Sequence, residues 1–420
     1  MSRINIKHFG PIESGCLASE GWIEIKKATV FIGNQGSGKS SVAKLISAFL
    51  WMEKVLTRGD YQPAQFNADY FKNTICRYHR IHNYFQSQRT EIIYEGDAYK
   101  FTYSPSDTLH IEKVEGSSYA LPQIMYVPAE RNFLSIIDKP GLIKQLPDSL
   151  VTFLDEYTNA KENIAEGYTL PVNNAQLVYN KSLDAVFIKG VSTNEDYSVK
   201  LSKASSGFQS LVPLLLVSDY LSGAINKQSE DAGKMNIDEE KRFREQVQSI
   251  YANNDLTDAQ RQIALSALSS KFNKSAFNNI VEEPEQNLFP TSQIEILQKL
   301  LLINNTQQSN KLILTTHSPY IVNELTMAVK AGMLQQAIEK NNGFIDQHSI
   351  SELETIYPLA SAILPEDVVI YELDELAGKI TKLDDYKGIP SDKNYLNSMF
   401  DENNNTFSDL LDFQQKYKIR

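Results

Sequence analysis

The sequence predicts an α/β fold with a mixed sheet, an antiparallel β subdomain and helical insertions. Residues 28–32 form a β-branched, apolar run that is typical of a buried strand. Residues 41–52 carry apolar side chains at helical spacing. Between the two runs lies the glycine-rich turn 33–40, with the sequence GNQGSGKS. Further short strands and longer helical stretches follow along the chain, which favours an α/β protein over an all-helical one.

The turn has the spacing of a phosphate loop: Gly33, four residues, then Gly38, Lys39 and Ser40. A strand, a glycine turn and a helix N-terminus form an anion site because backbone N–H groups converge and the helix dipole favours negative charge. We expect Lys39 to reach the β- and γ-phosphates of a nucleotide and Ser40 to hold Mg²⁺. The predicted nucleotide-binding residues here are Gly33, Asn34, Gly36, Ser37, Gly38, Lys39, Ser40 and Ser41.

Composition narrows the class of protein. The 420 residues are 42% hydrophobic and 22% charged, as in an ordinary globular protein. The net charge of −11 argues against a general polyanion binder. Cys16 and Cys76 are too few for a disulfide framework or a cysteine zinc cluster. No run approaches membrane-spanning length and no signal peptide is evident, so we expect a cytoplasmic protein without a membrane partner.

The remaining elements are predicted from apolar spacing and turn residues. Expected strands cover 3–9, 22–26, 91–103, 108–114, 123–127, 277–281, 311–315 and 368–373, with a β-meander at 177–179, 184–189 and 197–201. Expected helices cover most of 138–167, then 206–221 and 292–302, with an exposed helical hairpin at 226–274 and a polar tail at the end.

Two acids follow the strand at 277–281. Beside a phosphate-loop strand, Glu282 would help to position Mg²⁺ and Glu283 would orient or deprotonate an attacking water. A solvated acidic turn is the alternative. His317 follows the next strand, at the edge where α/β sheets bind ligands, and could contact a γ-phosphate.

A second anion-binding turn is predicted at the start of the helix that follows residue 205. Ser205, Ser206 and Gly207 place hydroxyls and a glycine at this helix N-terminus. Ordinary N-capping is the alternative interpretation.

In this order the motifs resemble those of ABC-type ATPases of the SMC, RecF and OLD-like group. The resemblance implies ATP and Mg²⁺ as cofactors, Glu283 and His317 as catalytic residues, and residues 288–290 as the end of a D-loop. It also implies that Ser205 and Gly207 contact the γ-phosphate held by another subunit, in a homodimer or higher homo-oligomer. Glu130 and Arg131 are assigned to the Q-loop position. Ala204 and Glu282 depart from the usual leucine and aspartate.

The expected organisation has five parts: an ATPase lobe at 1–140, a signature-bearing lobe at 141–225, an insertion at 226–276, an ATPase lobe at 277–330 and a C-terminal extension at 331–420. The chain also resembles the ATPase subunits of the Septu and PARIS anti-phage systems, which implies a separate nuclease or toxin effector. No nuclease motif is evident, since Asp374, Asp384 and Asp385 are explained as solvated loop charges. A RecF-like repair ATPase that binds DNA through residues 77–89, or an ATP-binding scaffold without hydrolysis, are the alternatives.

Overall fold

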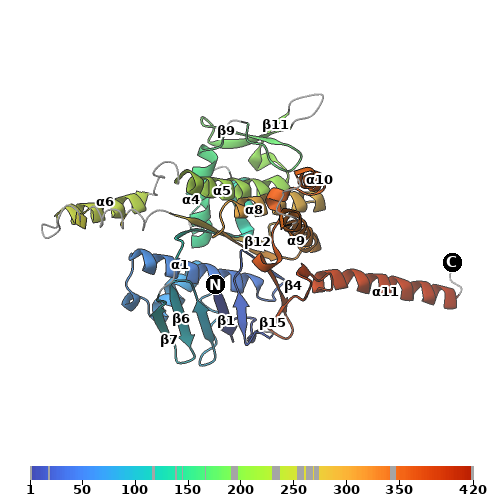
Figure 1. Ribbon diagram of the computed structural model, residues 1–420, viewed down its shortest axis with the longest axis horizontal. Helices are drawn as coiled ribbons and strands as arrows, with labels where there is room; N and C mark the ends of the chain where they lie inside the picture. The colour runs from blue at the N-terminus through green and yellow to red at the C-terminus, as the bar shows by residue number, and fades with distance from the viewer. Residues whose placement is uncertain are drawn as a thin grey trace.

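The structure is a computed structural model that describes residues 2–17, 19–115, 119–137, 140–143, 145–165, 167–190, 197–228, 237–252, 260–261, 268, 274–340 and 347–417. Its centre is a seven-stranded mixed sheet in the order β2-β15-β14-β4-β13-β12-β8 (Figure 1). The strands are β2 (Ser14–Cys16), β15 (Lys379–Lys382), β14 (Val368–Asp374), β4 (Ala28–Gly33), β13 (Lys311–Thr316), β12 (Ala276–Glu282) and β8 (Pro122–Val127).

The five strands from β14 to β8 run parallel, whereas β15 is antiparallel to β14. The carboxyl ends of β4, β13 and β12 therefore lie next to one another at one edge of the sheet. In α/β proteins this edge is where ligands bind.

The central sheet separates two hydrophobic cores. Along β4, Val30 and Ile32 pack into one core and Phe31 into the other, because successive strand side chains point to opposite faces. One core lies between the sheet, α1 (Lys39–Arg58) and an antiparallel five-stranded sheet. That sheet has the order β3-β1-β5-β6-β7, with β3 (Trp22–Glu24), β1 (Arg3–Lys7), β5 (Glu91–Glu95), β6 (Tyr99–Ser104) and β7 (Thr108–Lys113).

The other core holds most of the long helices and the meander (Figure 1). Its helices are α4 (Asp148–Glu162), α5 (Ser206–Gln228), α8 (Pro290–Asn305) and α9 (Pro319–Lys340). The meander consists of β9 (Gln176–Asn180), β10 (Ala185–Lys189) and β11 (Ser198–Lys200), all antiparallel. The predicted α/β fold with a mixed sheet, antiparallel β-structure and helices is confirmed.

Several predicted elements need correction. The single strand expected at 91–103 is wrong, since the chain turns between β5 and β6. Glu53 stabilises this turn because its carboxylate accepts the N–H groups of Ala98 and Tyr99 at 2.6 and 3.1 Å. The polar tail is in part a helix, α11 (Tyr395–Lys416), which projects from the body (Figure 1). Of the hairpin expected at 226–274, the structure describes α6 (Ile237–Ala252), which also projects; the second arm lies largely outside the described residues.

The remaining elements are short, apart from α10. They are η1 (Pro63–Gln65), α2 (Ala68–Tyr70), η2 (Phe71–Cys76), η3 (Ala129–Asn132), α3 (Phe133–Ile136), η4 (Pro140–Leu142), η5 (Leu201–Lys203), α10 (Gln347–Ile356), η6 (Leu359–Ser361), η7 (Pro365–Asp367), β16 (Asp385–Tyr386) and β17 (Ile389–Pro390).

One described helix stretch, Ser206–Ile225, is long and apolar enough to cross a membrane by length and composition. The expectation that no run approaches this length is therefore wrong. However, 72% of the apolar window is buried inside the protein, as in the core helix of a soluble domain. The apolar composition of this stretch is explained by its packing in the core.

Candidate nucleotide site

The glycine-rich turn connects the carboxyl end of β4 to the first turn of α1, as the sequence predicts. Gly33 has a φ of +139°, and a Cβ added there would lie 2.3 Å from the backbone oxygen of Leu373 on β14. Gly38 has a φ of +102° and lies against Pro11 and Ile12. Side chains at either position would clash or strain the backbone, which explains the glycine spacing.

Lys39 lies inside the turn and is 5% exposed. Its Nζ donates to the backbone oxygens of Gly33 at 2.9 Å and Asn34 at 2.7 Å. Burial lowers the pKa of Lys39 to about 8, while the negative charges of Glu283 and neighbouring acids oppose this shift. A buried ammonium inside the loop is well placed to gain from a phosphate anion.

Glu283 and His317 meet at the carboxyl edge of the sheet. Strand register aligns Glu282 with Thr315, and Thr316 with Ile32 of the phosphate-loop strand. His317 Nε2 lies 3.4 Å from Glu283 Oε1. The hydrogen bond from His317 lowers the pKa of Glu283, and the charges of His317, Lys39 and Arg131 act in the same direction.

The backbone of Glu283 has a φ of +44°, a left-handed conformation that is uncommon for a residue other than glycine. Its N–H donates to the backbone oxygen of Thr315 at 2.9 Å, which fixes the turn after β12. Strained backbone held by its surroundings is typical of functional sites.

Glu282 is 4% exposed, and its Oε1 has no hydrogen-bond partner among the described residues. Lys44 Nζ, one turn beyond Ser40 on α1, lies 3.9 Å from this oxygen. An orphaned carboxylate oxygen beside the start of α1, together with the Ser40 hydroxyl, fits the all-oxygen ligand preference of Mg²⁺. The described residues contain no group of three or more His, Cys, Asp or Glu side chains that could hold a metal.

Glu285 has a structural role that the sequence analysis did not assign. Its Oε1 accepts the Thr316 hydroxyl at 2.8 Å and the His317 N–H at 2.7 Å. Burial raises the pKa of Glu285. This side chain therefore fixes the loop that carries His317 relative to the acidic turn.

Arg131, assigned with Glu130 to the Q-loop position, makes contacts within the protein. The side chain is fully buried and donates to the backbone oxygens of Glu282 at 2.7 Å, Glu283 at 2.7 Å and Ser210 at 3.1 Å. These contacts occupy the guanidinium. They join the acidic turn to the start of α5. Glu130 is exposed and lies 3.3 Å from Arg80.

The serine-rich turn lies at the N-terminus of α5, where Ser205 and Ser206 are exposed. A Cβ on Gly207 would lie 2.9 Å from the backbone oxygen of Asn287, so the segment after the acidic turn packs directly against it. Asn287 Nδ2 also donates to Ser210 Oγ at 3.2 Å. Within the described part of the chain, no hydrogen bond joins 205–207 to the phosphate loop, and a role for these residues in nucleotide binding stays a prediction.

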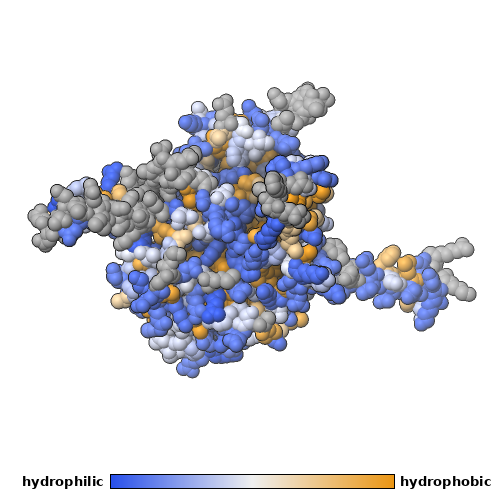
Figure 2. All heavy atoms as spheres, in the orientation of Figure 1, coloured by the Kyte–Doolittle hydropathy of each residue, from blue (hydrophilic) through white to orange (hydrophobic). Residues whose placement is uncertain are grey.

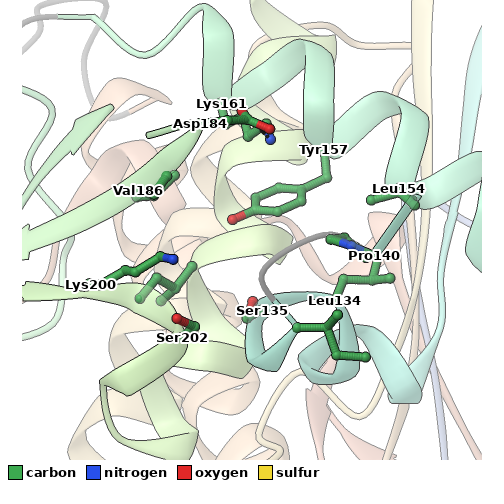
Figure 3. Close-up of a pocket in the computed structure, with 13 residues that line it drawn as sticks. Leu134, Ser135, Pro140, Leu154, Tyr157, Lys161, Asp184, Val186, Lys200 and Ser202 are labelled. Atoms are coloured by element: carbon green, nitrogen blue, oxygen red, sulfur yellow. Dashed lines mark ion pairs between the residues drawn. The ribbon is translucent and has the colours of Figure 1, made fainter. Parts of the chain in front are cut away.

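A small pocket lies beside this turn, between α3, α4, β10 and η5 (Figure 3). Lys161 and Asp184 form an ion pair of 2.7 Å at its side, and Tyr157 points into it. Its volume of about 50 Å³ is enough for a few water molecules but not for a nucleotide. The pocket therefore reflects the packing under the turn rather than a substrate site.

Two further segments bear on the site. Asn34 Nδ2 donates to Glu375 Oε1 at 2.7 Å, so the loop after β14 contacts the phosphate loop, which the sequence analysis missed. In the basic and aromatic segment 77–89, the arginines are exposed, and two of them lie near acids. Arg89 lies 3.3 Å from Glu13, Arg80 pairs with Glu130, and His79 is buried.

The fold and the loop define an α/β protein with a phosphate-loop site. Its sequence matches no protein-family model and no curated protein. Among solved structures, the chain is similar to the SMC head domain from Thermotoga maritima, with a TM-score of 0.38, 10% identity, and coverage of 91% of this chain and 98% of that chain.

The chain is also similar to an ATP-binding cassette in a dimeric, post-hydrolysis state bound to ADP and Pi. The TM-score is 0.27 at 11% identity, with 92% of this chain and 100% of that chain covered. At these values the similarities support no conclusion about the chemistry of this chain.

Proposed function

We propose that this protein binds and hydrolyses ATP. The observation that carries the proposal is the convergence of Lys39, Glu283 and His317 at the carboxyl ends of three adjacent parallel strands. Lys39 neutralises charge on the β- and γ-phosphates. Glu283 orients and deprotonates the attacking water, and His317 holds Glu283 and contacts the γ-phosphate. Mg²⁺, held through Ser40 and Glu282, supplies charge neutralisation when bound.

The complete site requires two chains. Ser205 and Ser206 are exposed, as is Phe289, which follows the acidic turn and is 72% accessible. An exposed aromatic side chain near an unused anion-binding turn fits a contact surface. We therefore assign the turn at 205–207 to the γ-phosphate held by a second copy, in a head-to-tail homodimer or higher homo-oligomer.

Measurement of phosphate release in the presence of Mg²⁺ and ATP tests the proposed ATP hydrolysis. The native protein should turn over ATP, and Lys39→Ala should lose binding and turnover. Glu283→Gln should keep ATP affinity and lose about 10²- to 10⁴-fold in turnover, the usual contribution of a general base. Glu366→Gln, an exposed change of the same type, should behave like the native protein. Unchanged turnover in Glu283→Gln would remove this residue from the chemistry, whereas ATP occupancy without any phosphate release would select the scaffold alternative.

The resemblance to defence ATPases leads us to propose control of a separate nuclease or toxin effector. The partner surface that fits this role is α11, which exposes Met399, Phe407, Leu410, Leu411 and Phe413 on a projecting helix (Figure 2). Glu402, Asp409 and Asp412 on the same helix favour a partner with an apolar groove and a basic rim. An effector encoded next to this protein should co-purify with it, and Phe407→Ser with Leu410→Ser should abolish the complex without changing ATP turnover.

A DNA-repair role would use the exposed Arg77, Arg80 and Arg89, of which Arg80 and Arg89 each lie 3.3 Å from an acid. Salt-dependent DNA affinity that is lost in the triple variant Arg77→Ala, Arg80→Ala and Arg89→Ala would support this role.

A further inference from the structure

A cavity of about 400 Å³ lies at the β8 edge of the central sheet, away from the phosphate loop's nucleotide contacts. It is bounded by α1, the segment 61–79, β8 and the start of α4, and its volume is that of a small-molecule site. The lining residues used below are Trp51, Tyr61, Thr74, His79, Tyr126 and Asp148.

The mouth of this cavity is aromatic. Trp51 is 36% exposed, and its ring centroid lies 5.8 Å from that of Tyr61 in an edge-on arrangement. Large, flat side chains at an open mouth favour a planar ring as the occupant, because aromatic faces stack on one another.

The floor of the cavity holds a buried histidine and a buried tyrosine. His79 and Tyr126 are each 4% exposed, and their rings are packed edge to face with centroids 4.9 Å apart. His79 Nδ1 has no hydrogen-bond partner among the described residues, whereas the Tyr126 hydroxyl lies beside the Glu282 carboxylate, and burial together with that carboxylate raises the pKa of Tyr126. Buried polar groups are normally satisfied, so His79 Nδ1 points to a ligand that brings its own hydrogen-bonding group.

The lining of the cavity contains no cation that would favour a phosphate group. Burial lowers the pKa of His79 to about 3, so its ring is neutral at physiological pH. No Lys or Arg lines the described cavity, and Asp148 adds negative charge at its side. The cavity therefore differs in chemistry from the phosphate loop and disfavours ATP itself.

We infer that this cavity binds a neutral nitrogen heterocycle of nucleobase or nucleoside size. The base would stack against the aromatic mouth, with a ring nitrogen or exocyclic amine hydrogen-bonding to His79 Nδ1. Tyr126 lies on β8, which pairs with the strand that ends in Glu282, so the occupant would bind one strand away from the acidic turn.

Calorimetric titration of the full chain with adenosine, guanosine, cytidine and thymidine tests the inference. The phosphate loop is first saturated with ADP and Mg²⁺, so that nucleosides report on the cavity alone, and ribose serves as the control without a base. At least one nucleoside should bind and ribose should not. His79→Phe, which keeps the ring and removes its nitrogens, should weaken binding by about tenfold or more. Thr74→Trp, at the exposed rim, should block the cavity.

Both variants should keep native ADP affinity, which shows that they fold. If no nucleoside binds, or if both variants bind like the native protein, the assignment is wrong. Because the readout is binding, it stands apart from the proposed hydrolysis, and an inactive ATPase would leave this test intact.

Discussion

The phosphate-loop edge and the serine-rich turn differ in how many of their functional side chains make contacts within one chain. At the edge, Lys39, Glu283 and His317 come from separate segments and contact the loop or one another. At the turn, Ser205 and Ser206 are exposed and make no described hydrogen bond to that edge. One region is assembled within the chain, and the other presents exposed serines to solvent.

The two regions are linked through Arg131, although no described hydrogen bond joins them directly. Arg131 bonds to Glu282 and Glu283 at the edge and to Ser210 just beyond the turn. A nucleotide that moves the acidic turn would therefore move the start of α5 in the same chain. In a head-to-tail dimer, such a link would couple the two composite sites.

The largest expected effect comes from blocking the turn. Ser205→Arg should leave ATP binding by the monomer intact and reduce turnover about 10²-fold or more, because the bulky side chain would hold the second chain away from the γ-phosphate and misplace the donors that face it. Ser106→Arg, the same change on an exposed hairpin far along the chain, should behave like the native protein.

A mixture of two inactive variants tests whether the turn acts across subunits. An equal mixture of Lys39→Ala and Ser205→Arg chains should recover about a quarter of native turnover, since half of the dimers then contain one intact composite site. If the mixture stays inactive while each chain folds, the turn does not act across subunits.

A smaller effect is expected where the two regions meet. Arg131→Met should lower the free energy of unfolding by about 3 kcal/mol, because several buried carbonyls lose their donor. Arg77→Met, an exposed change of the same type, should shift stability little. Denaturant unfolding measures both. Native stability in Arg131→Met would contradict the linking role.

The smallest effect concerns Lys39 in the nucleotide-free protein. Its pKa of about 8 lies below the ordinary value of 10.5, so the unfolded chain binds more protons between these pH values and native stability rises with pH across that window. At pH 7 the buried ammonium destabilises the fold, and Lys39→Met should raise stability on the order of 1 kcal/mol after solvent screening. The gain should vanish above pH 10.5, whereas Lys203→Met should change nothing. A lower melting temperature for Lys39→Met at pH 7 would contradict this account.

The sequence predicts those structural elements that local residue patterns determine. The phosphate loop, its strand and helix, the meander and the strands before Glu282 and His317 all follow from apolar period and glycine spacing. Such patterns do not predict which strands pair when they lie far apart in the sequence. β14 lies beside β4 across some 340 residues of sequence, which brings Glu375 to Asn34, and no local signal predicts this. Arg131 is similar, because a charged residue in a polar loop gave no indication of full burial against three distant carbonyls.

The head-to-tail composite site is tested most directly by sedimentation velocity of Glu283→Gln, in which ATP should be bound but not consumed. With Mg²⁺ and ATP the protein should shift from the mass of one chain to that of two or more, and Ser205→Arg added to Glu283→Gln should abolish the shift. A sedimentation coefficient that ATP leaves unchanged, with ATP binding verified in the same sample, would contradict the composite site.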